Sequence, residues 1–274
     1  MRLPVLIFDI ETLTDLKAGA HLYGLSLDDA DLEQALTKIR RQESGSDFQR
    51  LALHEIVCIS GLWIDEDQRI KLFSFSQEDH SEAEILQKFF SIFQKRNPTL
   101  VSWNGAQFDL PVIQLRAMYH GLSAASLFDQ GEIDQQKRYN NYQNRYHQRH
   151  IDLMDVFAMF NGRNFHKLDD VAQLFGLPGK RGEPGYHVPQ YVKSAQWQSL
   201  TRYCEGDVLN TWLLYLRWGL LKGQLTHTAH QTWIQTTIAY LAQHHQQDEF
   251  LQLWRASSQH TAFTQFDFSS SPID

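Results

Sequence analysis

Residues 4–14 read PVLIFDIETLT, a run of apolar strand-forming residues that carries two acids, Asp9 and Glu11. Alternate residues of a β-strand project to the same face, so both carboxylates are expected on one side, roughly 6.5 to 7 Å apart along the chain. Burying two like charges together raises the pKa of one of them strongly. The stretch therefore predicts a buried strand whose carboxylates meet a cation, a basic partner or solvent at the strand's end.

Composition sets the broad class of the protein. The 274 residues are 42% hydrophobic and 12% aromatic, enough for one large domain or a domain with an appendage. Lys and Arg total 25 against 32 Asp and Glu, a net charge of -7 that argues against coating nucleic acid by charge alone. The two cysteines lack paired spacing, so we expect neither a disulfide framework nor a zinc site, and a cytoplasmic setting. Asp9 interrupts the first apolar run, and we expect no signal peptide and no membrane span.

Hydrophobic periodicity and turn signals predict the order of the secondary-structure elements. Strands are expected at about residues 4–10, 54–65, 69–76 and 99–104. Helices are expected at about residues 28–41, 81–96, 110–121, 195–221 and 226–256. Three strands in a meander, followed by alternating strands and helices, predict a mixed sheet covered by helices, with ligands at the carboxyl ends of its strands.

Two further acids stand in apolar surroundings. Asp109, in SWNGAQFDLPVI, follows a predicted strand and starts a predicted helix, and Asp207, in TRYCEGDVLNTW, lies within a helix. Tyr203 lies one helical turn before Asp207, so both side chains face the same way. With Asp9 and Glu11 these acids predict an all-oxygen site for Mg2+ or Mn2+. Two such ions roughly 3.5 to 4 Å apart can clamp the attacking and leaving oxygens of a phosphodiester.

The blocks FDIET, NGAQFD and YCEGD, in this order, resemble the three motifs of the DnaQ-like (DEDD) 3'-5' exonucleases, in the DEDDy subgroup whose third motif is Tyr-x-x-x-Asp. The likeness is closest to the proofreading exonuclease domain of family B DNA polymerases, and LDDVAQLFGLPGK resembles its stand-alone relatives. The resemblance covers about residues 1–220. It implies a ribonuclease H-like α/β fold: a central mixed sheet of about five strands flanked by helices, its first three strands antiparallel neighbours, with a C-terminal helical extension.

The resemblance also implies a role for each acid. Asp9, Glu11 and Asp207 would bind a first metal ion. Asp9 would bridge to a second metal ion, which Asp109 would hold. Tyr203 would orient the attacking water, and a phenol with a pKa near 10 is in any case a poor base at neutral pH. A nucleoside 5'-monophosphate would leave from the 3' end.

Substrate contacts are expected from two places. The resemblance puts Thr12, Asn104 and Phe108 against the last nucleotides, with Phe108 as a wedge or stacking ring worth about 1 to 3 kcal/mol per base. The basic segment 137–150 is equally consistent with binding to single-stranded nucleic acid and with a solvated loop. Its candidate phosphate ligands are Lys137, Arg138, Arg145 and Arg149, and its candidate stacking rings are Tyr139, Tyr142 and Tyr146. We interpret His147 and His150 as polar loop residues, because no cysteine pair at zinc-ligand spacing is near.

We therefore expect an exonuclease domain over residues 1–222, with an insertion at about 15–52, then a helical extension and a disordered polar tail over 223–274. The expected function is a metal-dependent 3'-5' exonuclease on single-stranded nucleic acid, with DNA the expected substrate although RNA stays open. One alternative is a non-catalytic nucleic-acid-binding or interaction module. Another is a carboxylate-pair hydrolase such as a glycosidase, active without metal. The insertion is a candidate lid, protein-partner site or tolerated excursion, and the extension is a second candidate partner site.

Overall fold

The computed structural model describes residues 2–180, 187–244 and 248–258. The polar tail that the sequence predicts to be disordered lies outside these residues. The described part of the chain contains no helix with both the length and the apolar character needed to cross a bilayer.

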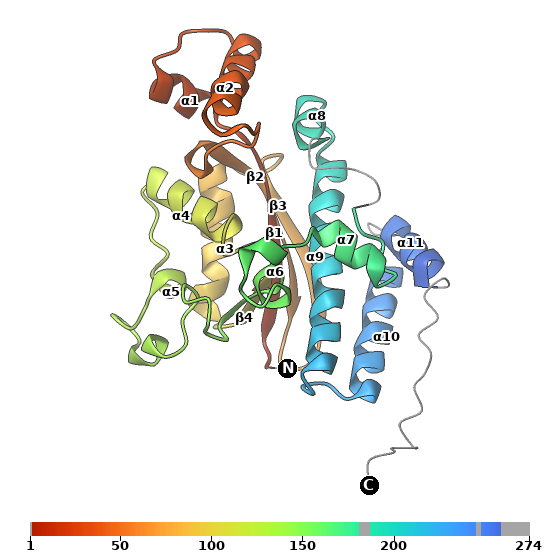
Figure 1. The fold of residues 1–274 in the computed structure, drawn as a ribbon. Helices are drawn as coiled ribbons and strands as arrows, with labels where there is room; N and C mark the ends of the chain where they lie inside the picture. The colour runs from red at the N-terminus through yellow and green to blue at the C-terminus, as the bar shows by residue number, and fades with distance from the viewer. Residues whose placement is uncertain (1, 181–186, 245–247, 259–274) are drawn as a thin grey trace.

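A five-stranded sheet forms the centre of the molecule (Figure 1). Its strands are β1 (Val5–Thr14), β2 (His54–Ile64), β3 (Ile70–Ser76), β4 (Thr99–Ser102) and β5 (His150–Asp152), in the order β3-β2-β1-β4-β5. β1 pairs antiparallel with β2, and β2 with β3, whereas β4 runs parallel to both β1 and β5. The predicted mixed sheet of ribonuclease H-like order, with its first three strands antiparallel, is confirmed.

β1 is the central strand and is buried on both faces, which explains its nearly continuous apolar sequence. Val5 and Ile7 belong to the core on one face, while Leu6, Phe8 and Ile10 belong to the core on the other. The strand runs four residues beyond its predicted end, and its register with β2 shifts between Glu11 and Thr12. This irregularity lies directly after the second acid of the opening stretch.

Helices cover both faces of the sheet. One face carries α3 (Glu82–Lys95) and α4 (Asp109–Tyr119), and α5 (Ala125–Phe128) packs beside α3. The other face carries the 25-residue helix α9 (Trp197–Leu221), with α6 (Leu153–Phe157), α7 (Leu168–Leu174) and α10 (His227–Gln243) sharing its core. A capping box begins α3, because the side chains of Ser81 and Glu84 accept hydrogen bonds from each other's backbone amides.

The region 15–53 forms a lobe above the sheet, where β1 ends and β2 begins (Figure 1). It contains the predicted helix, α2 (Asp29–Ser44), together with α1 (Leu16–Tyr23) and a short 3-10 turn at Leu51–Leu53. α1 has no counterpart among the predicted elements. Gly19 lies so close to α2 that a Cβ at this position would approach the Leu36 side chain to 2.4 Å, so the absence of a side chain lets the two helices pack closely.

The C-terminal extension packs on α9. Two helices, α10 and α11 (Asp248–Ser258), stand where one helical stretch was predicted. The Trp212 Nε1 donates a hydrogen bond to Thr237 Oγ1 at 3.0 Å, and the rings of Trp212 and Trp233 meet edge to face. At the other end of the same helix, α8 (Val188–Lys193) packs against the start of α9 (Figure 1).

Candidate active site

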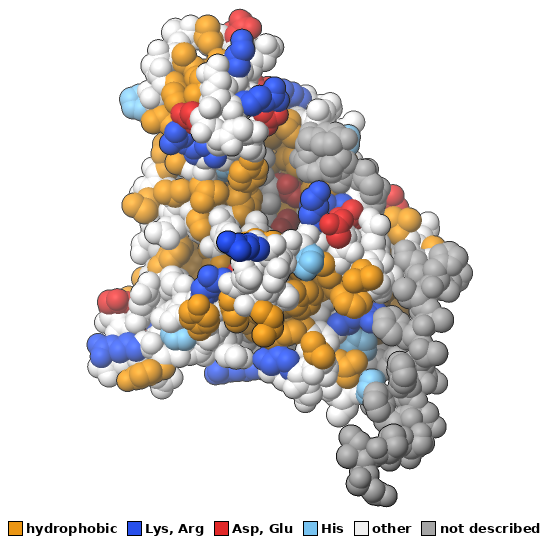
Figure 2. All heavy atoms as spheres, in the orientation of Figure 1, with side chains coloured by type: hydrophobic (Ala, Val, Ile, Leu, Met, Phe, Trp, Pro, Cys, Tyr) orange, Lys and Arg blue, Asp and Glu red, His pale blue; other side chains and the backbone are white. Residues whose placement is uncertain are grey.

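Three elements bring the motif acids together. Asp9 and Glu11 lie on β1, Asp109 is the first residue of α4, and Asp207 lies on α9, which packs against β1 and β2. Asp109 and Asp207 are buried, whereas Asp9 and Glu11 are half-buried. In Figure 2, acidic side chains are visible in a recess near the middle of this face. The structure therefore brings together the four acids that were predicted from the sequence. Their roles in metal binding stay a prediction.

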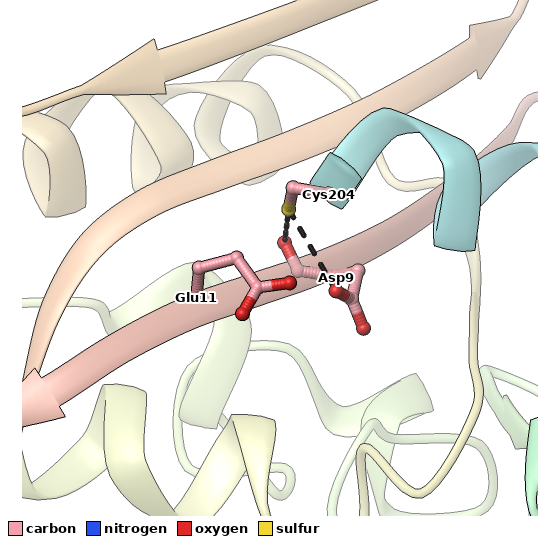
Figure 3. A group of neighbouring side chains, drawn as sticks. All are labelled: Asp9, Glu11 and Cys204. Carbon is pink, nitrogen blue, oxygen red and sulfur yellow. Dashed lines mark hydrogen bonds between the residues drawn. The ribbon is translucent and has the colours of Figure 1, made fainter. Parts of the chain in front are cut away.

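Asp9 and Glu11 point toward the same place, together with Cys204 of α9 (Figure 3). One potential ligand atom from each of the three lies within 4.8 Å of the others. Cys204 Sγ lies 3.5 Å from the backbone oxygen of Asp9 and 3.7 Å from its Oδ2. Burial raises the pKa of the Cys204 thiol well above its usual value, so the sulfur stays protonated and acts as a weak donor. The ligands on offer are therefore carboxylate oxygens, which suit a hard cation.

Burial raises the pKa of every acid in this group, and repulsion from neighbouring acids adds to the shift. For Asp9, burial raises the pKa most, followed by the charges of Asp109 and Asp207. Burial raises the pKa of Glu11 from 4.5 to about 8, although Lys180 opposes the shift. Ionising these groups together is unfavourable, so a positive charge that binds among them lowers their pKa values and is itself bound more tightly.

Asp109 and Asp207 show the same effect from different neighbours. Burial raises the pKa of Asp109 to about 8, with a further contribution from Asp152, while a hydrogen bond with the backbone of Ile10 opposes the shift. Burial also raises the pKa of Asp207, and Lys180 lowers it. Asp109 is not the N-cap of α4, because the N-cap residue of this helix is Phe108.

Lys180 is a site residue that the sequence analysis did not select. Its Nζ donates hydrogen bonds to the Tyr203 hydroxyl at 2.9 Å and to Asp207 Oδ2 at 2.5 Å. Burial disfavours the charged ammonium, but Asp207 and the other nearby acids outweigh this and raise its pKa. The loop before Lys180 is fixed by Asn210, whose side chain bonds both the amide and the carbonyl of Gly179. Lys180 is the last residue of the block LDDVAQLFGLPGK, and its place in this block is the sequence feature that could have indicated a role in the site.

Tyr203 points its hydroxyl to the same place. The Lys180 Nζ lies over the Tyr203 ring, 4.9 Å from the ring centre. Burial raises the pKa of Tyr203, as does Asp207, so the phenol stays protonated near neutral pH. Because the oxygen accepts the Lys180 hydrogen bond, its own hydrogen is free to be donated to another group. This arrangement agrees with a positioning role and not with a general base.

Asp152 is a second residue missed by the sequence analysis. Its carboxylate accepts hydrogen bonds from the backbone amides of Asn104, at 2.9 Å, and Ala106, at 3.0 Å. It therefore fixes the loop that leads into Asp109. Asn104 has a φ of 67°, and a Cβ at Gly105 would come within 2.2 Å of Ser102 Oγ, so the loop has little freedom. Asp152 ends a three-residue strand, too short to produce a periodic signal.

The predicted nucleotide-contact residues divide into two groups. Thr12, Asn104 and Phe108 adjoin the acids: Thr12 follows Glu11, and the loop from Asn104 to Phe108 leads to Asp109. The basic segment 137–150 is instead divided between side chains that are buried and side chains that are exposed. Tyr142 is buried, and its hydroxyl donates to Asn97 Oδ1 and the Pro98 carbonyl, so the prediction that it stacks on a base is wrong.

The other basic and tyrosine residues of this segment differ in burial and in the groups that they contact. Lys137 and Arg149 are buried and bond backbone carbonyls, those of Ser126 and Asn97, so their prediction as phosphate ligands is wrong. Arg145 is partly exposed and pairs with Asp155 at 2.8 Å, Arg138 lies against Gly131, and Tyr139 and Tyr146 are exposed.

The two histidines of this segment also have local partners. His147 Nδ1 accepts a hydrogen bond from the backbone amide of Asn141. His150 is not a loop residue as predicted but the first residue of β5, buried and bonded to Ser102 Oγ. Burial lowers the pKa of His150 to about 4, so its ring is neutral at physiological pH.

Comparison with known proteins identifies the family. The family described as "Predicted 3'-5' exonuclease related to the exonuclease domain of PolB" matches residues 46–258, which is more than half of the chain. The chain belongs to this family.

Two particular relatives agree with this membership. The catalytic chain of DNA polymerase epsilon from Dictyostelium discoideum is 29% identical over 153 residues, covering 53% of this chain and 6% of that protein. The structure of the family B DNA polymerase from the hyperthermophilic archaeon Pyrobaculum calidifontis superposes with a TM-score of 0.50 and 23% identity, covering 81% of this chain and 25% of the polymerase. This chain thus corresponds to a small part of each polymerase, and the structural likeness supports the ribonuclease H-like fold.

Proposed function

We propose that this chain is a metal-dependent 3'-5' exonuclease that releases nucleoside 5'-monophosphates from the 3' end of single-stranded DNA. The observation that carries this proposal is the group of four carboxylates that β1, α4 and α9 bring together, two of them buried and two half-buried, whose pKa values are all raised. Fully ionised, these four acids with Lys180 carry a net charge of -3, which two divalent cations would more than neutralise. Their oxygen ligands fit Mg2+ or Mn2+.

The residues have distinct proposed roles. Asp9, Glu11 and Asp207 would hold one cation, and Asp9 with Asp109 would hold the second. Bound divalent cations supply an activated water and neutralise charge on the scissile phosphate. Membership of the DEDDy subgroup rests on Tyr203, which stands one helical turn before Asp207 on α9.

Tyr203 and Lys180 would act on the water and the phosphate. The Tyr203 hydroxyl accepts a hydrogen bond from Lys180, so its own proton points to a further acceptor and orients the water for in-line attack. The Lys180 ammonium, held between Tyr203 and Asp207, places a positive charge where the phosphate gains negative charge. Asp152 keeps Asp109 in place by fixing the loop from Asn104 to Ala106.

The test uses a 5'-labelled single-stranded DNA and its RNA counterpart, each incubated with Mg2+ or Mn2+. The wild type is expected to shorten the DNA from its 3' end, and Asp9→Ala is expected to be inactive. Asp47→Ala is the matched control, because Asp47 is an exposed acid paired with Arg41 on the N-terminal lobe. No shortening of either substrate would support a non-catalytic module, and activity that survives EDTA would support a metal-independent hydrolase.

A further inference from the structure

Three rings from separate parts of the chain meet beside the acids. Phe48 comes from the end of the N-terminal lobe, His54 is the first residue of β2, and Phe108 directly precedes Asp109. The ring centres of Phe48 and His54 are 5.0 Å apart, those of Phe48 and Phe108 5.4 Å, and those of His54 and Phe108 5.0 Å. We call these three residues the aromatic platform.

The platform is fixed to the strand that carries two of the acids. His54 Nδ1 shares a hydrogen bond of 2.8 Å with the hydroxyl of Thr12, which directly follows Glu11. His54 Nε2 lies 3.3 Å from the carbonyl oxygen of Gln49. Burial lowers the pKa of His54, so at neutral pH the ring is an uncharged surface. Both ring nitrogens are thus used within the protein, and only the ring faces and edges are left for packing.

The outermost ring is open to solvent. His54 is buried and Phe108 half-buried, whereas 55% of the Phe48 surface is exposed. Hydrophobic side chains lie exposed between the upper lobe and the acidic recess in Figure 2. A flat apolar ring held by two others and left partly uncovered is what a base needs for stacking.

We propose that Phe48 is a stacking surface for a base of the single strand whose 3' end lies among the four acids. This inference rests on the proposed function, since it takes nucleic acid as the substrate. Phe48 belongs to none of the three motif blocks, so the N-terminal lobe contributes a residue to the substrate site. A stacked base does not depend on base identity, which suits an enzyme that removes every nucleotide in turn.

Equilibrium binding tests the platform without cleavage. The probe is an oligothymidylate with 2-aminopurine at one position near its 3' end, in Ca2+ instead of Mg2+, with the full-length chain. Stacking is expected to quench the 2-aminopurine emission on binding to the wild type. Phe48→Ala is expected to weaken binding by about 5- to 150-fold, the range for one lost base-ring stack, and to reduce the quenching.

Two substitutions separate stacking from simple packing of the lobe. Phe48→Trp keeps an aromatic ring and is expected to bind and quench as the wild type does, whereas Phe48→Leu keeps apolar bulk and is expected to behave as Phe48→Ala. Leu22→Ala is the matched control, because Leu22 is equally exposed, at 55%, and lies on α1 of the same lobe. Thermal unfolding of each variant shows whether the fold is intact.

Each result has a definite meaning. Wild-type affinity and quenching in Phe48→Leu would overturn the stacking role, because bulk alone would then suffice. An equal loss for Phe48→Ala on a probe with abasic sites throughout would also overturn it. If the wild type cleaves DNA and Phe48→Ala matches it in affinity and KM, the platform fails while the proposed exonuclease stands. If the wild type neither binds nor cleaves any strand, both fail.

Discussion

Two clusters of partly or fully buried ionisable side chains in this protein differ in the balance between acids and bases. The site cluster consists of Asp9, Glu11, Asp109 and Asp207 with Lys180. The anchor cluster consists of Asp15, Glu82, Arg116 and His120. In the anchor cluster Arg116 donates to Asp15 Oδ2 at 2.7 Å and to both Glu82 oxygens, at 2.8 and 2.6 Å, and His120 meets Glu82 at 2.6 Å.

The anchor cluster satisfies each of its carboxylate oxygens within the protein. Asp15 Oδ1 accepts the Ala18 amide as the N-cap of α1, and Glu82 Oε1 also accepts the Ile56 amide. Burial disfavours the charged Arg116, but its hydrogen bonds with Glu82 and Asp15 outweigh this and raise its pKa. The cluster joins the N-terminal lobe to α3 and α4, so it is a structural device.

The site cluster has four acids and one lysine, and burial raises the pKa of each acid. Burial of acids alone therefore does not indicate function, whereas a group of acids that lacks enough basic partners and is held by a rigid frame does. If this is correct, removing one charge has opposite effects on stability in the two clusters.

The largest expected effect is on the anchor cluster. Arg116→Met leaves two buried carboxylates without their partner and is expected to lower the free energy of unfolding by about 3 to 5 kcal/mol. Urea denaturation measures this. The control is Arg69→Met, whose ion pairs with Asp65 and Asp67 are exposed, so a much smaller loss of stability is expected. Similar small losses in both variants would contradict the structural role of the anchor.

The next effect is on the site cluster. Asp9→Asn is expected to reduce nuclease activity by more than about 100-fold, beyond the loss typical for a residue that only supports a metal ligand. In EDTA, however, it is expected to raise the free energy of unfolding, because it removes one member of a mutually repelling group. Nuclease assays and urea denaturation in EDTA test the two parts. A destabilised Asp9→Asn protein in EDTA would show that Asp9 is held by balanced contacts after all.

Metal binding gives a third, smaller effect. Adding Mn2+ to about 100 times its dissociation constant is expected to stabilise the wild type by about 2.7 kcal/mol, and EDTA is expected to reverse this. Differential scanning calorimetry follows the change. Asp9→Asn is expected to lose the response, and Arg69→Met is expected to keep it. Equal stabilisation of Asp9→Asn and the wild type would place the bound ion elsewhere.

Much of the candidate site could be predicted from the sequence because each of its acids lies in a short, recognisable block. FDIET, NGAQFD and YCEGD are short blocks on strongly patterned elements, so their order predicted both the sheet and the four acids. Lys180 and Asp152 were missed because each acts across a long sequence separation, on Asp207 and on the loop at Asn104. Composition failed at Tyr142, because a basic, tyrosine-rich segment gives no indication of which ring the fold buries against Asn97 and Pro98.

The smallest expected effect, when expressed per pH unit, is the pH dependence of the stability that Glu11 contributes. The pKa of Glu11 is raised from 4.5 to about 8, so its contribution to metal-free stability is fully present below pH 4.5 and is lost as pH rises through about 8. The free energy of unfolding of the wild type, minus that of Glu11→Gln, is therefore expected to fall between pH 5 and pH 8 in EDTA, by at most about 1.4 kcal/mol per pH unit.

A matched carboxylate with the opposite shift supplies the control for this titration. Hydrogen bonds from Ser81 lower the pKa of Glu84, so its contribution is present above its usual pKa of 4.5 and is lost as pH falls below that value. The difference for Glu84→Gln is therefore expected to stay flat between pH 6 and pH 8. Saturating Mn2+ is expected to abolish the Glu11 decline, because ionised Glu11 then has a cation to bind. A Glu11 difference that rises with pH in EDTA would mean that the site cluster is already balanced by positive charge within the protein, as the anchor cluster is.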